Sequence, residues 1–145
     1  MTSRQTVILI AIKVGLFLAI ALVVILNYDS CVGDTERKQA SELKRIASTF
    51  TPYPGATAVG EKVVSKHRLV SFYLHYNTQD DFARVSEFYD SQITASGWRS
   101  VETPPSIFGG KPDGRQYRKG DYGIFVLRDE DRPTHYDVVF EWSPQ

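Results

Sequence analysis

Residue types that build disulfides, metal sites and nucleic-acid surfaces are scarce in this chain of 145 residues. It contains one cysteine, Cys31, and three scattered histidines, so it has neither an internal disulfide nor a metal-ligating histidine pattern. Its 17 basic residues equal its 17 acidic ones, and a neutral chain lacks the basic surface that phosphate contacts need. We therefore expect no metal, no cofactor and no nucleic-acid partner.

Acidic residues are absent from the first 28 positions, and most of that stretch is apolar. Residues 6–27 read TVILIAIKVGLFLAIALVVILN. At about 1.5 Å per residue, a helix of this length crosses a hydrocarbon core of about 30 Å, and a lone span in lipid has to be helical. We predict that residues 1–28 form a short cytoplasmic tip and a transmembrane anchor, with the lipid bilayer as partner.

Charge around the anchor predicts its orientation. Arg4 and Lys13 lie at its amino-terminal end, whereas Asp29 follows it, so the positive-inside rule places the N-terminus in the cytoplasm. We expect Lys13 to snorkel to the interface, with pairing to a partner helix as the alternative. A cleavable signal peptide with its apolar core at residues 14–26 is a second alternative, but a small-x-small cleavage site is missing. The sequence therefore favours an uncleaved signal anchor and a single-pass protein.

Cys31 lies just beyond the anchor, without a neighbour that would activate its thiolate. We interpret it as a thiol without a special role, with an intermolecular disulfide or a lipid attachment as alternatives. A lipoprotein signal is disfavoured, because such a signal has small residues before the cysteine, whereas Tyr28, Asp29 and Ser30 precede Cys31.

Residues 29–51 are predicted to be a spacer helix. Its apolar residues form one narrow stripe, Ala40, Leu43, Ile46 and Ala47, which predicts a helix that rests lightly on the domain or on a partner. The prolines of the segment TPYPG at 51–55 end it. Residues 52–145 then form the extracytoplasmic domain, and we expect residues 50–145 to hold a complete core.

The domain is predicted to be α+β. Alternation of apolar and polar residues predicts an antiparallel sheet of about five strands, with one long helix packed on one face. Lys66 and His67 are the expected turn between the first two strands. The segments with strand character are 57–65, 68–76, 98–103, 115–119, 122–128 and 135–142.

The long helix has the strongest local signals. Thr78 to Asp81 has the form of an N-cap with acidic residues in the first turn. Gly97 is placed for a left-handed residue at the helix end, with Trp98 packing back in a Schellman ending; the alternative is an exposed Trp98 that binds a ligand or partner. The residues expected to have structural roles are Thr78, Phe82, Val85, Tyr89, Ile93, Gly97 and Trp98.

Short motifs occur in a fixed order along the domain. They are Tyr53-Pro54-Gly55-Ala56, Tyr76-Asn77-Thr78, Phe88-Tyr89 and Gly97-Trp98. Together they resemble the "YPGA … FY … GW" pattern of small extracytoplasmic domains of bacterial membrane-anchored proteins and lipoproteins, over about residues 52–142. The resemblance implies a bacterial cell membrane, with the domain in the periplasm or extracellular space. Such domains are mostly of unknown function, so it implies no catalytic residue.

Catalytic and ligand-binding motifs are incomplete in the sequence. Asp129-Glu130-Asp131 lacks the glycine and bidentate glutamate of a calcium loop, and Gly109-Gly110-Lys111 lacks the hydroxyl residue of a phosphate loop. His75 and His135 would be neighbours only if their strands pair, and no serine is recognisable as a nucleophile. We therefore expect no enzymatic activity.

The remaining functional classes are two. We predict a non-enzymatic interaction or accessory module of a membrane protein complex, because tethering raises the effective concentration of a module at a membrane partner. The alternative is a domain that binds a small ligand or an envelope polymer. In either case the expected exposed contacts are Tyr73, Tyr117 and Tyr122, unless these tyrosines are ordinary sheet surface.

Overall fold

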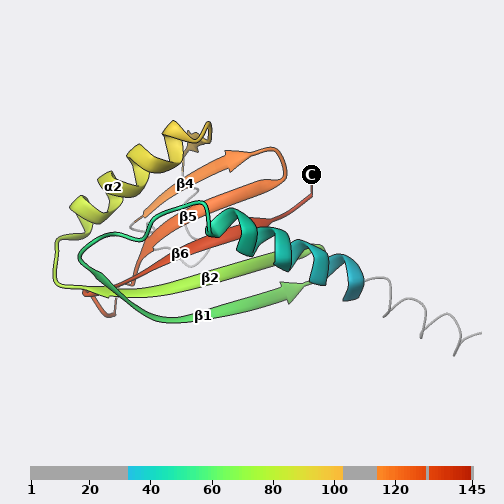
Figure 1. Cartoon of the computed structure of the whole chain (residues 1–145), viewed down its shortest axis with the longest axis horizontal. Coiled ribbons are helices and arrows are strands. Elements are labelled where there is room, and N and C mark those ends of the chain that lie inside the picture. Colours follow the sequence, from blue (N-terminus) through green and yellow to red (C-terminus); the bar gives the residue numbers. More distant parts are fainter. Residues whose placement is uncertain (1–32, 103–113, 130, 145) are drawn as a thin grey trace, which may run out of the picture. The chain divides into compact units, whose positions relative to one another are not determined.

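The computed structural model of the chain describes residues 33–102, 114–129 and 131–144 (Figure 1). The predicted anchor, Cys31 and the glycines at 109–110 lie outside these residues. Within them, no helix combines the length and the apolar character needed to cross a membrane. The chain divides into two compact units, Met1–Arg37 and Lys38–Gln145, and the second unit holds the sheet.

Six strands form one sheet in which all neighbours are antiparallel, in the order β1-β2-β6-β5-β4-β3. The α+β class is confirmed. The sheet has six strands where about five were expected, and β3 lies within the predicted strand segment 98–103. The strands are β1 (Ala56–Lys66), β2 (Leu69–Thr78), β3 (Arg99–Val101), β4 (Gly114–Lys119), β5 (Tyr122–Arg128) and β6 (His135–Trp142).

Tight turns fix the register of two hairpins. Lys66 pairs with Leu69, so the β1–β2 turn consists of His67 and Arg68, one residue later than predicted. His67 has φ +53°, a backbone conformation that matches the first central residue of a tight primed turn. Gly120, with φ +59°, opens the turn between β4 and β5.

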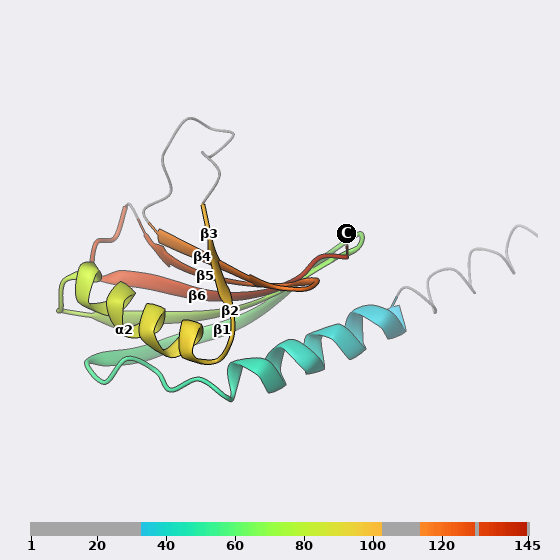
Figure 2. The same cartoon turned by 90° about the horizontal axis from the view of Figure 1, so that it is seen from above.

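One face of the sheet carries both helices. Figure 2 shows α2 (Phe82–Ala95) and the carboxyl-terminal part of the helix at residues 33–47, called here the amino-terminal helix, on the same side of the strands. Many sheet residues of this face are almost inaccessible to solvent. They include Val70 and Phe72 on β2, Ile124 and Val126 on β5, and Tyr136, Val138 and Phe140 on β6.

The amino-terminal helix is part of the core. Leu43 is 1% exposed and Ala47 is 7% exposed, and both belong to the same buried cluster as the sheet residues. The prediction that this helix rests lightly on the domain is therefore wrong, and residues 50–145 do not hold the whole core. Two close-packed positions on a narrow stripe are enough to bury one side of a helix when the sheet below presents large aromatic rings.

The ends of α2 differ in how well the sequence predicted them. Asp81, not Thr78, is the N-cap, and its side chain accepts a hydrogen bond from the Ala83 N–H at 3.2 Å. Thr78 belongs to β2, where its hydroxyl donates to the Gly55 carbonyl. The described first turn of α2 has no acidic residue, so the expected acidic residues precede the helix.

The carboxyl end of α2 is a Schellman ending. Gly97 has φ +80°; its N–H donates to the Thr94 carbonyl and the Trp98 N–H donates to the Ile93 carbonyl, as this motif requires. Trp98 is 8% exposed and lies in the core, as do Val85, Tyr89 and Ile93, while Phe82 packs on the core's rim. The alternative of an exposed Trp98 is thereby excluded.

Candidate binding site: an apolar cavity beside an exposed sheet edge

The segment between the amino-terminal helix and β1 is held on the domain by side chains from distant elements. The Tyr53 N–H donates to the Tyr89 hydroxyl at 3.2 Å, and the Tyr53 hydroxyl donates to Asp80 Oδ2 at 3.0 Å. A Cβ atom on Gly55 would lie 2.5 Å from the same Asp80 oxygen, closer than such atoms approach. The YPGA motif therefore fixes this segment in place.

A side-chain amide completes this attachment. Gln92 of α2 accepts a hydrogen bond from the Thr51 N–H at 2.6 Å and donates to the Thr51 carbonyl at 3.2 Å. The ring of Tyr53 meets that of Phe88 edge to face, at 5.5 Å between centroids. Residues of the YPGA and FY motifs are thus in direct contact, and their role here is to hold the segment against α2.

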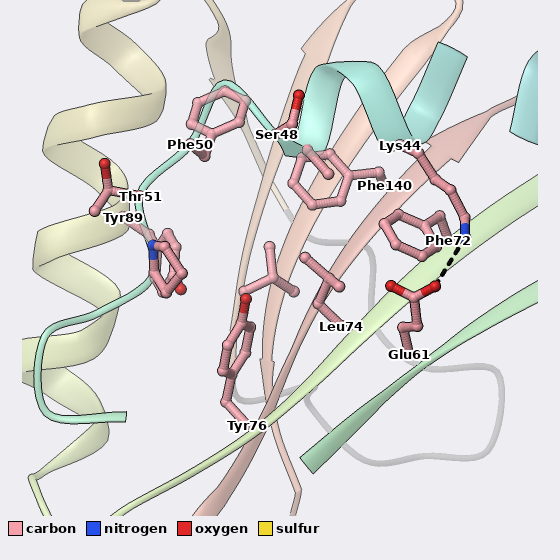
Figure 3. A pocket seen from close by; sticks show the side chains of 13 residues that line it. Lys44, Ser48, Phe50, Thr51, Glu61, Phe72, Leu74, Tyr76, Tyr89 and Phe140 are labelled. Carbon is pink, nitrogen blue, oxygen red and sulfur yellow. Dashed lines mark hydrogen bonds and ion pairs between the residues drawn. The ribbon is translucent and has the colours of Figure 1, made fainter. Parts of the chain in front are cut away.

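Beneath this segment lies a cavity of about 300 Å³. Its floor comes from Phe72, Leu74 and Tyr76 on β2 and from Val138 and Phe140 on β6. The amino-terminal helix and the segment that follows it form the roof, with Ala47, Phe50 and Pro52. Figure 3 shows Phe50, Phe72, Leu74, Tyr76 and Phe140 around one space. A cavity of this volume is at the lower end of the range of about 300–1,000 Å³ for small-ligand pockets.

An ion pair lies at one side of the cavity. Lys44 Nζ, from the amino-terminal helix, is 2.8 Å from Glu61 Oε1 on β1 (Figure 3). The same ammonium group lies 5.1 Å from the centroid of the Phe72 ring. Both side chains are about half exposed, so the pair contributes little to stability. Its two charges cancel at the entrance to an otherwise uncharged space.

Tyrosine rings lie at the opposite side of the cavity. Tyr76 stacks on Tyr136 at 5.3 Å between centroids, and the Tyr89 and Tyr136 hydroxyls are 3.5 Å apart. Burial raises the pKa of all three phenols above the usual value, most strongly for Tyr136. These hydroxyls therefore stay protonated at physiological pH and supply neutral polar groups rather than charge.

Strand β1 forms one rim of the cavity and one edge of the sheet. Ten of its eleven residues are exposed, and its outer side has no neighbouring strand in the sheet of the described chain. Val59, Val63 and Val64 are 58%, 41% and 36% exposed. Of the four large hydrophobic residues that stand out as exposed in the described part, three are on this strand; the fourth, Val101, is on the opposite edge strand β3.

The three tyrosines expected as surface contacts do not form one surface. Tyr117 is fully buried and donates to Asp90 Oδ1 at 2.9 Å, so its predicted exposure is wrong: strand alternation turns it toward the helices. Tyr122 is half-buried on the same face and donates to Gln39 Oε1. Tyr73 is half-buried on the other face and stacks on His75 at 6.0 Å.

The face of the sheet without helices carries charged pairs. His75 Nδ1 lies 2.7 Å from Asp137 Oδ1, and Arg118 lies 3.1 Å from Glu141. Strands β2 and β6 do pair, but His75 is opposite Asp137, and His135 is opposite Asn77. Among the described residues, no three His, Cys, Asp or Glu side chains are grouped to hold a metal ion.

Sequence reasoning missed the residues that shape the cavity. Lys44 and Glu61 are 17 positions apart in the chain and meet only because the helix folds back over β1. Gln92 lies on α2, and the backbone groups of Thr51 that it binds are 41 positions away in the chain. No local pattern encodes such contacts. The one usable signal was a charged residue, Glu61, in a strand position that alternation assigns to the helix side.

Comparisons with known proteins give no relative of the chain. No protein-family model matches the sequence, and neither a curated protein nor a solved structure matches it.

Proposed function

We propose that the chain is a membrane-anchored, non-enzymatic interaction module on the extracytoplasmic side of a bacterial membrane, and that it pairs the edge of β1 with an extended segment of a membrane protein complex. The observation that carries this proposal is the length and exposure of β1. An exposed edge strand presents unpaired backbone groups that accept another strand.

The hairpin geometry identifies the backbone groups that point outward. Lys66 and Leu69 flank a two-residue turn, so they form the hydrogen-bonded closing pair, and the following residues alternate between inward and outward groups. The N–H and C=O groups of Ser65, Val63 and Glu61 therefore point away from β2. Their side chains lie on the helix face, because Val63 and Glu61 are opposite Phe72 and Leu74.

Features that normally protect an edge limit the available length. The register shifts between Ala58 and Gly60, and such a bulge interrupts pairing. Lys62 and Lys66 also place charge along the edge, which disfavours uncontrolled association. The regular stretch from Gly60 to Lys66 remains, so we expect a partner strand of about that length rather than open-ended polymerisation.

The anchor supports the same function. A strand added to a seven-residue edge forms few contacts, and its affinity in free solution is low. The predicted transmembrane helix holds module and partner in the same membrane, which raises their effective concentration without new contacts. A weak edge contact is sufficient under these conditions.

Photo-crosslinking of the full chain in its own membranes tests the proposal. A photoreactive amino acid at Val63 is expected to crosslink to one membrane protein, whereas the same group at the buried Val70 is not. Val63→Pro removes an outward N–H without breaking the β1–β2 ladder and should abolish copurification of that protein in mild detergent. Val63→Thr keeps the N–H and should retain the partner.

The result that contradicts the proposal is equally specific. A partner that copurifies equally with the Val63→Pro and Val63→Thr chains binds elsewhere on the molecule. Circular dichroism melting of both variants is the control for folding, and both should melt within a few degrees of the unsubstituted chain.

A further inference from the structure

The cavity beneath residues 44–52 is a second site, which borders the edge of β1 and shares Glu61 with it. We propose that it binds the alkyl chain of an uncharged single-chain lipid, with the head group beside Lys44 and Glu61. This assignment rests on the shape of the floor, the charge balance of the entrance and the absence of charged groups from the far end.

The floor is elongated. Phe72, Leu74 and Tyr76 are alternate residues of one strand, so it extends roughly 13 Å along β2 at about 3.3 Å per residue. Phe140 and Val138 lie opposite Phe72 and Leu74 on β6 and double its width. A narrow apolar trough of this form fits an extended alkyl chain better than a compact ring system.

The entrance selects the head group. Lys44 and Glu61 form an ion pair at 2.8 Å, so the entrance has no net charge. An anionic head group would face Glu61 and a cationic one would face Lys44, whereas a hydroxyl can donate to the carboxylate and accept from the ammonium group. The charge-balanced pair therefore favours an uncharged polar head group.

The far end of the trough has no charged group. Tyr76 and Tyr89 line it, and their phenols are neutral at physiological pH because the ordinary pKa of a phenol is about 10. Figure 3 shows these two tyrosines across the cavity from the Lys44–Glu61 pair. An alkyl chain that enters beside the ion pair therefore ends against aromatic rings.

Photolabelling of the full chain in phosphatidylcholine nanodiscs tests this assignment. The probes are decanol, decanesulfonate and decyltrimethylammonium, each with a diazirine at the chain end. The head groups are neutral, anionic and cationic, and their charges do not change with pH. Decanol is expected to label the tryptic peptides 69–84 and 85–99, which contain Tyr76 and Tyr89. Each charged probe should label them roughly two- to fivefold less, as expected for one exposed like-charge contact.

Single substitutions of the ion pair should reverse the preference. Lys44→Gln leaves the Glu61 carboxylate and should favour the cationic probe, whereas Glu61→Gln leaves the ammonium group and should favour the sulfonate. Lys62→Gln is the matched control, because the Lys62 side chain alternates to the other face of β1, and it should keep the preference for decanol. Unchanged preferences in both Lys44→Gln and Glu61→Gln would overturn the role of the pair.

Two further measurements separate the cavity from the bilayer. Leu74→Trp fills the trough and should reduce labelling of both peptides at least fivefold. Excess decanol without the diazirine should reduce the labelling of both peptides equally in the unsubstituted chain. This competition does not depend on whether the Leu74→Trp variant folds. Labelling that survives the excess decanol overturns the assignment and indicates random reaction at the membrane surface.

Discussion

The two helices of the described residues cover the same face of one sheet in different ways. The inward side chains of α2, Val85, Tyr89 and Ile93, are at most 2% exposed, and the helix has a side-chain cap at one end and a Schellman ending at the other. The amino-terminal helix buries Leu43 just as deeply, but a cavity of about 300 Å³ remains beside it. One helix completes the core, and the other encloses a space.

This difference assigns stability to the sheet region under α2 and ligand binding to the region under the amino-terminal helix. A close-packed interface contributes free energy through every buried methylene group, whereas an apolar cavity forfeits such contacts. The sheet therefore carries its most specific packing under α2 and its candidate ligand site under the amino-terminal helix.

Ile93→Ala removes a core side chain from the close-packed side. We expect the free energy of unfolding to fall by about 4 kcal/mol, because the rigid surroundings cannot close the new cavity. Chemical denaturation of the full chain measures this loss. A loss below about 1 kcal/mol would show that the α2 interface is loosely packed.

Leu43→Ala makes a comparable change on the side with the cavity. We expect a smaller loss of about 2–3 kcal/mol, because the helix that carries Leu43 borders the cavity through Lys44 and Ala47 and can shift more easily into the vacated space. The informative quantity is the difference between the losses of unfolding free energy in the Ile93→Ala and Leu43→Ala chains. A Leu43→Ala chain that loses more stability than the Ile93→Ala chain would reverse the assignment of the two regions.

Alkaline pH should weaken the tyrosine cluster between the two regions. The pKa of Tyr136 is raised in the folded chain, so its phenol stays neutral while that of the unfolded chain ionises near pH 10. The contribution of the neutral Tyr136 phenol to the free energy of unfolding is thus fully present below pH 10, and it is lost as the pH rises above 10. Between pH 10 and 11, the free energy of unfolding of the Tyr136→Phe chain should therefore fall by about 1 kcal/mol less than that of the unsubstituted chain.

The matched control for this titration is Tyr73→Phe, on the face without helices. It should follow the unsubstituted chain when urea unfolding is measured from pH 8 to 11. Parallel curves for Tyr136→Phe and the unsubstituted chain would mean that ionisation of Tyr136 does not limit alkaline stability.

Gly97→Ala should have the smallest effect, about 1 kcal/mol. The nearest atom to an added Cβ is Lys119 Nζ at 3.7 Å, so the cost comes from φ +80° and not from a steric clash. Gly60→Ala is the control, because no atom lies within 4 Å of its added Cβ and its φ is not positive. Thermal melting should show a lower midpoint for Gly97→Ala alone.

The parts of the fold that the sequence predicted correctly are those with strong local signals. Alternation over 122–128 and 135–142 gave β5 and β6 with the observed bounds, and Gly97 marked the helix end. Thr78 was misplaced as a cap because Ser, Thr and Asp are all good caps, and only the packing of β2 against Gly55 decides between Thr78 and Asp81.

Long-range contacts account for what the sequence did not predict. A tyrosine in a strand can face either side of the sheet, and the sequence around Tyr117 does not distinguish the two sides. Tyr117 is buried because its side of the sheet is the one that the helices cover. The cavity depends on the height at which residues 44–52 cross the sheet, and that height is fixed by Gln92 and Tyr89 from another helix. Periodicity carries no information on such distances.

The attachment of Thr51 and Tyr53 to α2 has a consequence for binding entropy. Because Gln92 and Tyr89 hold the roof before any ligand arrives, a molecule that enters the cavity does not have to order a loop. Binding to such a preorganised space is limited by the ligand's own loss of freedom. Gln92→Ala should therefore change the entropy of ligand binding more than its enthalpy.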